Sequence, residues 1–385
     1  MQFFKLIIRN TFRQKLRTFL TIIGMSIAIL AFSLLSTVIE TWYMGVNSAS
    51  PKRLVTRNAV SLIFPLPLGE RSKMLQIPGV NQVAYANWFA GIYIDERNFF
   101  PRMAIGPDNF FDLFPEILLS PDELKAFWKE RNACIVGRKL IERYGWRIGD
   151  TITLTGNIYP GEWRFVLRGV YRGATRTVDE TQFFFNWNYL DETLKKTTPS
   201  RAGQVGWYIV QIQNPSDAGQ VSQSIDAVFK NSWAVTLTET EKAFQAGFVA
   251  MTEAIVIAIR IVSYVVICVI LVILANTMAM TSRERMPEYA VLKTLGFGDK
   301  YLCLLIAGES VFLSMLGGLL GIVLAYPAAD IFSAKMGTFL PVFHIRWKTP
   351  LVCGLVSFGI GLLSALIPIW RAGRVRIAEA LGHVG

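Results

Sequence analysis

Four long apolar runs constrain this chain more than any other feature of its sequence. They cover residues 20–39, 261–280, 301–325 and 351–370. Each reaches the roughly 20 residues that a helix needs to cross the hydrocarbon core of a membrane. The stretch between the first two runs has the mixed composition of a soluble domain. The pattern therefore predicts one membrane span, a large domain outside the membrane, and then three further spans.

The predicted fold class is an α-helical membrane protein with four transmembrane helices and an inserted α+β extracytoplasmic domain. The whole chain is 52% hydrophobic and 17% charged. This composition is too apolar for a soluble protein and too charged for a protein that lies in the membrane throughout. The predicted segments are a cytoplasmic amphipathic helix (1–17), a first span (18–40), a periplasmic domain (41–237), a stalk with the second span (238–280), a cytoplasmic coupling helix (281–300), a third span (301–328), a periplasmic loop (329–349), a fourth span (350–370) and a cytoplasmic tail (371–385).

The distribution of charge predicts the orientation. Residues 1–17, 281–300 and 371–385 together hold twelve basic and four acidic residues, a net charge of +8 out of the formal +11 of the chain. Four spans place these three short segments on one side of the membrane, and the positive-inside rule makes that side cytoplasmic. Both termini are therefore expected inside. The basic residues that fix the topology then account for the high pI, without a surface for binding phosphates. We therefore expect no nucleic-acid partner.

The N-terminal segment carries two interleaved rows of residues at a spacing of four. A helix with such rows lies in the membrane interface, with its apolar side in lipid and its basic side toward anionic headgroups. Ordinary positive-inside anchoring is the alternative explanation. The apolar run that follows is too long for a cleavable signal peptide. The rows are Phe4, Ile8, Phe12 and Leu16, and Lys5, Arg9, Arg13 and Arg17.

The large domain shows two stretches in which strand and helix patterns alternate, at about 50–95 and 204–237. They flank a different region, about 99–190, whose turn and strand patterns favour antiparallel pairing. Cys134 is the one cysteine of this domain, so no disulfide within the domain is expected and Cys134 is predicted to be a small core residue.

A long helix is predicted to link this domain to the second span. Thr238-x-x-Glu241 is a capping-box pattern, and no proline follows it before Met280. A continuous helix of this length would be about 60 Å long, twice the thickness of the bilayer core. Half of it should therefore form a stalk outside the membrane. Its packing stripe is predicted to consist of Phe244, Phe248, Met251 and Ile255.

Residues 282–296 form a short charged segment between the second and third spans. Pro287 suits the first position of a helix, Glu288 favours its first turn, and Gly296 can supply a left-handed cap. The pattern predicts a short amphipathic helix. By composition alone, a tight turn whose charges only fix the topology is as good an interpretation.

The order of residues in this segment resembles the coupling segment of the FtsX/MacB family of ABC-transporter permeases, which in that family contacts a separate ATPase. Pro287 departs from the family pattern, which usually has a basic residue there. The resemblance implies the following ATPase-coupling residues: Glu284, Arg285, Glu288, Leu292, Lys293, Leu295 and Gly296.

The third and fourth spans carry further candidates. Glu309 lies about two turns inside the third span, where a carboxylate is costly unless it faces other helices or water. The family often has an acid there, which implies a structural or coupling role. Gly317 and Gly321, and Gly361 with Ser357, have the spacing of small residues that lets helices approach closely. The tail, with Pro368-x-x-Arg371-Ala372 and Ala380-Leu381, also resembles the family's ending.

The resemblance implies a permease subunit of a MacB-like ABC transporter in the bacterial inner membrane, working as a homodimer with two copies of a separate ATPase. ATP and Mg would be bound by that ATPase, and conformational change would pass through the stalk to the periplasmic domain (mechanotransmission) for export or extraction of a substrate. A periplasmic adaptor or membrane fusion protein is a further implied partner. Two alternatives remain open: a LolC/LolE-like permease that releases lipoproteins or lipids, and an FtsX-like regulator of cell-wall hydrolases.

Catalytic motifs are missing from the sequence. No Gly-x-x-x-x-Gly-Lys-Ser/Thr loop occurs, so the chain is not expected to hydrolyse ATP by itself. No serine nucleophile elbow or zinc-type Cys/His spacing occurs either. We therefore predict no catalytic residue, no metal site and no cofactor bound by this chain.

Overall fold

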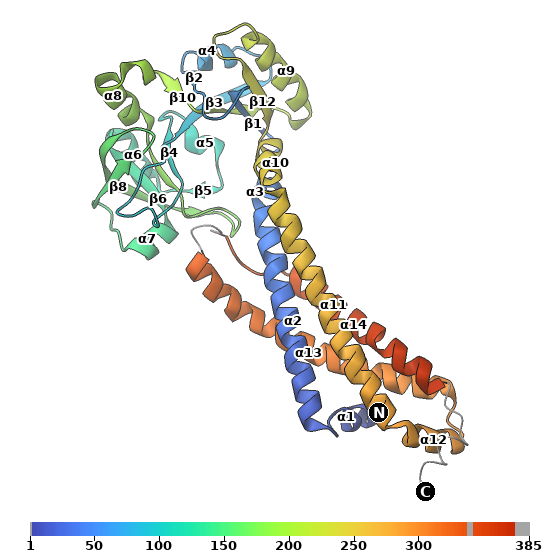
Figure 1. The fold of residues 1–385 in the computed structure, drawn as a ribbon. Coiled ribbons are helices and arrows are strands. Elements are labelled where there is room, and N and C mark those ends of the chain that lie inside the picture. The colour runs from blue at the N-terminus through green and yellow to red at the C-terminus, as the bar shows by residue number, and fades with distance from the viewer. Residues whose placement is uncertain (1, 337–341, 374–385) are drawn as a thin grey trace. The chain divides into compact units, whose positions relative to one another are not determined.

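The computed structural model describes residues 2–336 and 342–373 and divides into two compact units. A helical unit comprises Met1–Thr41, Thr252–Ala334 and Phe343–Gly385. A mixed α/β unit comprises Trp42–Met251 and Lys335–Val342 (Figure 1). Most of the predicted tail, with Ala380 and Leu381, and part of the predicted 329–349 loop lie outside the described residues.

The helical unit contains the predicted spans. Four of its helices are long and apolar enough to cross a membrane: Lys15–Trp42, Glu253–Glu284, Asp299–Ser333 and Lys348–Ala372. The third extends well beyond the predicted boundary at residue 328. The helices of the unit are α1 (Gln2–Thr11), α2 (Lys15–Trp42), α11 (Glu253–Glu284), α12 (Met286–Thr294), α13 (Asp299–Met336) and α14 (Lys348–Gly373).

The four long helices share one apolar core, because each contributes a buried stripe and leaves the rest of its surface exposed. The stripe of α11 recurs every four residues, at Ile270, Leu274 and Met278. This spacing keeps the three side chains on one face of the helix. The exposed faces are as apolar as the buried ones, as expected for helices surrounded by lipid.

The α/β unit contains one large sheet flanked by short helices. The strands are β1 (Arg53–Asn58), β2 (Leu66–Pro67), β3 (Val80–Trp88), β4 (Arg102–Ile105), β5 (Ile117–Leu118), β6 (Ala133–Gly137), β7 (Thr151–Gly156), β8 (Gly161–Gly173), β9 (Phe183–Asn186), β10 (Gln204–Val205), β11 (Trp207–Ile212) and β12 (Thr236–Thr240). The helices are α3 (Met44–Ser48), α4 (Glu70–Met74), α5 (Phe110–Leu113), α6 (Pro121–Lys129), α7 (Arg138–Tyr144), α8 (Trp187–Thr197), α9 (Ala218–Phe229) and α10 (Glu241–Met251), with single 3₁₀ turns at Pro199–Arg201 and Pro215–Asp217.

The sheet has ten strands in the order β12-β1-β11-β3-β4-β9-β6-β8-β5, with β7 paired to β8. The predicted insert is therefore joined to the flanking halves through the β3–β4 pair, where Ala86 lies opposite Ile105. The expected antiparallel pairing in the insert is confirmed for β7 with β8 and also occurs between β6 and β9, whereas β4 pairs with β9 and β6 with β8 in parallel. Helix α7 lies between β6 and β8 in the chain, within the crossover connection that this parallel pair requires.

Alternating side chains on the central strands form two separate cores, one on each face of the sheet. Phe183 and Phe185 of β9 belong to one core, whereas Phe184 between them belongs to the other. Successive side chains of a strand point to opposite faces, so a strand covered on both sides is apolar throughout. Cys134 of β6 is fully buried in the first core, which confirms its prediction as a core residue.

The predicted continuous helix from residue 238 to 280 is wrong at three places. Thr238 lies in β12 and not at a helix start, and the side chain of Thr240 accepts the backbone N–H of Ala243 instead. Thr252, with ψ of 12°, then separates α10 from α11. Helix α11 itself continues to Glu284, four residues beyond the expected end.

Candidate functional site

The predicted coupling segment is a distinct helix that begins directly after the second span. Arg285 interrupts the helical backbone for one residue, and α12 follows, with Pro287 at its second rather than its first position. Gly296 has φ of +92°, as the sequence predicted for a left-handed cap. Its N–H bonds to the carbonyl of Lys293, and that of Phe297 bonds to the carbonyl of Leu292. These two bonds form a complete Schellman motif, which ends the helix sharply.

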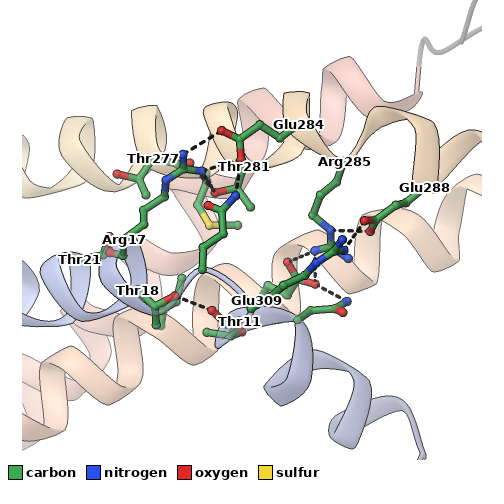
Figure 2. A pocket seen from close by; sticks show the side chains of 15 residues that line it. Thr11, Arg17, Thr18, Thr21, Thr277, Thr281, Glu284, Arg285, Glu288 and Glu309 are labelled. Atoms are coloured by element: carbon green, nitrogen blue, oxygen red, sulfur yellow. Dashed lines mark hydrogen bonds and ion pairs between the residues drawn. The ribbon is translucent and has the colours of Figure 1, made fainter. Parts of the chain in front are cut away.

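Three carboxylates around this segment meet side chains from the N-terminal elbow, which we define as residues 10–17 between α1 and the first turn of α2. Glu284 and Glu288 come from the coupling segment, and Glu309 comes from α13. Figure 2 shows these groups converging from three parts of the chain that are far apart in sequence. All three acids were predicted from the sequence, whereas Arg13 and Arg17 were predicted only as part of a basic row that faces lipid headgroups.

The two outer carboxylates pair with arginines spaced four apart. Arg17 donates to both oxygens of Glu284 at 2.8 and 2.9 Å, and Gln14 adds a bond of 2.6 Å. Arg13 donates to Glu288. Partial burial alone would raise the pKa of Glu288, but the bonds from Arg285 and Arg13 outweigh it and hold the pKa below its ordinary value. Glu288 is therefore an ionised, internally paired carboxylate.

The inner carboxylate is almost completely buried. The side chain of Glu309 is 4% exposed and that of Arg285 is 11% exposed. One terminal nitrogen of Arg285 lies 2.8 Å from both oxygens of Glu309, and Nδ2 of Asn10 donates to Oε1 at 2.9 Å. Nε of Arg285 also donates to Glu288 at 3.0 Å. Arg285 thus links the inner and the outer carboxylates.

A cavity of about 130 Å³ lies between the elbow, the end of α11 and α13, which is enough room for several water molecules. Its lining is polar and electrically balanced. Several of its threonine hydroxyls, such as those of Thr277 and Thr281, donate to the preceding turn of their own helix. Among the described residues, no group of three or more His, Cys, Asp or Glu side chains could hold a metal ion. We find no catalytic arrangement in this cavity.

The other face of α12 presents apolar side chains to the outside. Tyr289 and Ala290 are buried, whereas Val291, Leu295 and Phe297 are 47%, 70% and 40% exposed. We call these three residues the apolar edge. Among the remaining predicted coupling residues, Leu292 packs against the helical core and Lys293 pairs with Asp299 at 2.8 Å. Of the predicted coupling residues, Leu295 thus belongs to the apolar edge, whereas Leu292 and Lys293 pack or bond within the helical unit.

The predicted small residues lie where helices come closest. A Cβ atom added to Gly317 would lie 2.5 Å from Cβ of Met25, and one at Gly321 would lie 2.6 Å from the carbonyl oxygen of Ser26. Both glycines thus face α2. Gly361 of α14 faces α13, where an added Cβ would lie 2.7 Å from Cα of Val311. None of the three sites has room for a side chain.

The predicted stalk stripe is not the packed face of the structure. Phe244 and Phe248 contact each other edge to face at 5.0 Å, but Met251 is 84% exposed and Ile255 is 54% exposed. Helix α10 instead packs against α3, with Gln245 against Gly45 and with Val249 buried. The spacing of the phenylalanines therefore did not identify the face of α10 that contacts α3, because that face contains Gln245.

The comparisons with known proteins cover both parts of this arrangement. Residues 18–228 match the model of the MacB-like periplasmic core domain, and residues 260–377 match that of the FtsX-like permease C-terminal domain. The second match includes the coupling segment and Glu309, and the first includes most of α2 and every strand of the large sheet except β12.

Two relatives align with very different shares of this chain. An uncharacterized ABC transporter permease of Methanocaldococcus jannaschii is 23% identical over 407 aligned positions, covering 97% of this chain and 96% of its own. The uncharacterized ABC transporter permease YknZ of Bacillus subtilis is 34% identical over 110 positions, covering 28% of this chain and 26% of its own.

Solved structures resemble the α/β unit in fold. The periplasmic region of MacB from Actinobacillus actinomycetemcomitans matches with a TM-score of 0.39 at 10% identity, covering 53% of this chain and 95% of that one. The extracellular domain of YknZ from Gram-positive bacteria matches with a TM-score of 0.36 at 11% identity, covering 49% of this chain and 100% of that one. On the strength of the family models, which span more than half of its length, the chain belongs to the FtsX/MacB family of ABC transporter permeases.

Proposed function

We propose that this chain is the transmembrane subunit of a MacB-like transporter, in which a separate ATPase drives a conformational change of the large domain for export or extraction of a substrate. The observation that carries the proposal is the two-sided coupling helix. One side of α12 is bonded into the helical unit, and the apolar edge of Val291, Leu295 and Phe297 is exposed. A helix that presents an apolar edge fits a hydrophobic groove on a partner.

The contact with the ATPase is expected at the apolar edge and not at Glu288. Pairing of Glu288 with a base of the partner was the expectation from the sequence. In the structure Glu288 already has two arginine partners, so a base of the partner would have to displace Arg13. Exposed ion pairs contribute little, whereas a helix that docks into a groove is anchored by its apolar face. ATP and Mg would be bound by the partner.

A photo-crosslinking experiment tests this contact. A photoreactive amino acid at Leu295 of the full chain, expressed in its own cells, should capture a P-loop ATPase. The same amino acid at Arg164, which is 70% exposed in the α/β unit, should not. Capture of the ATPase at both positions, or at neither, contradicts the proposed docking edge.

The oligomeric state and further partners belong to the same proposal. We expect two ATPase copies and a second copy of this permease, with an adaptor or membrane fusion protein as a further partner. Purification of the tagged full chain with its partners separates the possibilities. A second, different permease would indicate a LolC/LolE-like system, and a cell-wall hydrolase would indicate an FtsX-like regulator.

The proposed orientation in the inner membrane places both termini in the cytoplasm and the α/β unit outside. Cysteine introduced at Ser200, an exposed residue of that unit, should then react with an impermeant maleimide in intact spheroplasts. Cysteine at Thr294, exposed on α12, should react only after the membrane is permeabilised. The reverse pattern of labelling would exclude this topology.

A further inference from the structure

We propose that Glu309 and Asn10 are positioning residues for the coupling segment. Through Arg285 they hold the junction between α11 and α12 against α13 and α1, so that these elements move as one body. The inference depends on the proposed function only in its last step, where the force on α12 comes from an ATPase. The bonds themselves lie within this chain.

Arg285 lies at the junction of two helices, where its side chain can set the direction of the second one. The residue has φ of −102° and ψ of 12° and forms the break between two helices. A continuous helix fixes the direction of its next turn through the backbone ladder, but a break removes this constraint. Side chains must then set the direction of α12, through the packing of Tyr289 and Leu292 on the helical core and through directional bonds. Arg285 supplies them, with one nitrogen held by Glu309 of α13 and another by Glu288 of α12.

Asn10 extends the same anchor to the N-terminal helix. Its amide donates to Glu309, so one carboxylate joins α1, the α11–α12 junction and α13. Next to it, an added Cβ at Gly308 would lie 2.7 Å from Cδ1 of Ile7, which shows how closely α1 packs on α13. The polar bond and the apolar contact together fix the orientation of α1.

The ion pairs form a series from buried to exposed. Side-chain exposure is 11% and 4% for Arg285–Glu309, 27% and 37% for Arg17–Glu284, and 65% and 40% for Arg13–Glu288. Exposed pairs exchange partners readily, whereas separation of a buried pair leaves an uncompensated charge. The inner pair is therefore the costliest of the three to separate, which makes it the fixed point of the series.

Stability alone does not account for the buried pair. Apolar side chains of similar volume often replace a buried ion pair without loss of stability. They do not provide bonds of fixed direction to three elements at once, which a carboxylate and a guanidinium do. A carboxylate within a membrane span is also costly unless it has such partners. The geometry thus favours a role in orientation.

The test uses the full chain alone in nanodiscs, with spin-labelled unnatural amino acids at exposed positions. Labels at Arg9 and Thr294 report the distance between α1 and α12, and labels at Thr294 and Leu319 report the distance between α12 and α13. Both wild-type distance distributions should be narrow. Asn10→Ala should broaden the first distribution at least twofold and leave the second unchanged.

Changes to the ion pair should affect both distances. Glu309→Gln should broaden both distributions, and Glu309→Asp, which retains the charge, should broaden them less. Arg283→Gln is the control, since it removes an exposed charge beside the network, and it should change neither distribution. Unchanged widths in Asn10→Ala and Glu309→Gln overturn the proposal, as does equal broadening by Glu309→Asp and Glu309→Gln. If Glu309→Gln does not fold, Asn10→Ala decides alone.

The result is independent of the ATPase experiment above. Broadened distributions without any ATPase captured at Leu295 would retain the positioning role and reject the proposed function. Narrow distributions in every variant, together with capture of an ATPase at Leu295, would reject the positioning role and retain the proposed function.

Discussion

Arg53 of β1 and Glu241 in the first turn of α10 form a buried ion pair, with Nε 2.7 Å from Oε2. The same guanidinium donates to Glu116 at 2.6 Å and to the carbonyl of Leu113 at 2.8 Å, and it stacks over the ring of Phe114. One side chain thus connects the start of α10 with the segment that follows α5. Within the α/β unit, α10 is tied to the sheet at this point.

Removal of this guanidinium should destabilise the α/β unit strongly. Arg53→Met leaves the half-buried Glu241 and Glu116 without their cation, and loss of one partner of a buried pair typically costs about 3–5 kcal/mol. Thermal unfolding of the full chain should therefore shift to a clearly lower temperature. Arg164→Met is the control, because its pair with Glu162 is 70% exposed on both sides and should contribute nothing measurable. Equal melting temperatures for the two variants would contradict the structural role of Arg53.

Glu70 should make stability depend on pH. Its carboxyl lies on α4, 6% exposed, with Oε2 lacking a hydrogen-bond partner among the described residues. Burial raises its pKa from 4.5 to about 7, although Lys73 opposes part of the change. The folded state then binds more protons than the unfolded state between these values, so stability falls as pH rises through this range. The full difference corresponds to about 3 kcal/mol.

Glu70→Gln removes this titration. The variant should match the wild type near pH 4 and melt at a higher temperature at pH 8, because the wild type must then hold a buried charge. Melting curves of the full chain across this range provide the measurement. Glu162→Gln, at an exposed carboxylate, should leave the pH dependence unchanged. A wild-type melting temperature that does not fall between pH 5 and 7 would contradict the raised pKa.

Two glycines of α14 should respond oppositely to the same substitution. An added Cβ at Gly361 collides with Oγ of Ser314 and with the backbone of α13, whereas none of the atoms considered lies within 4 Å of one at Gly359. Gly361→Ala should therefore cost about 1–3 kcal/mol through overpacking. Gly359→Ala should be neutral or slightly stabilising, since alanine favours helices by up to about 1 kcal/mol over glycine. Thermal unfolding in detergent measures both, and a neutral Gly361→Ala would mean that α13 and α14 are not in close contact.

The overall fold was largely predictable, because span length and charge bias are local properties of the sequence. The error at Thr238 shows where local patterns fail. Thr238-x-x-Glu241 has the spacing of a capping box, but in the folded sheet the hydroxyl of Thr238 bonds to the hydroxyl of Thr56 and donates to the carboxylate of Asp226. Strand pairing with a segment about 180 residues away therefore overrides the local preference.

The candidate site was predictable in its members but not in its connections. Glu284, Glu288 and Glu309 were identified from order and position, yet their partners lie in the N-terminal elbow. A signal for this pairing does exist: Arg13 and Arg17 are four apart, as are Glu284 and Glu288. Residues at this spacing lie on one face of a continuous helix, but here the elbow at Arg13 and the break at Arg285 interrupt both helices. The sequence contains other basic pairs with this spacing, such as Lys5 and Arg9, so only the fold selects the partners.

The break at Thr252 changes where proline should disrupt the helix. In α11, Ala254 is the second residue after the cap, and the N–H groups of a first helical turn have no partner within the helix. Ala254→Pro should therefore be tolerated, although a continuous helix from residue 238 would predict severe damage. Ala258→Pro lies one turn further along, where proline removes a bond to Ala254 and clashes with its carbonyl, at a cost of about 3 kcal/mol or more. Thermal unfolding of the full chain should show a large loss for Ala258→Pro and a small one for Ala254→Pro, with Ala258→Leu as the control that retains helix propensity. Equal losses for the two proline variants would mean that the helix passes through Thr252 without interruption.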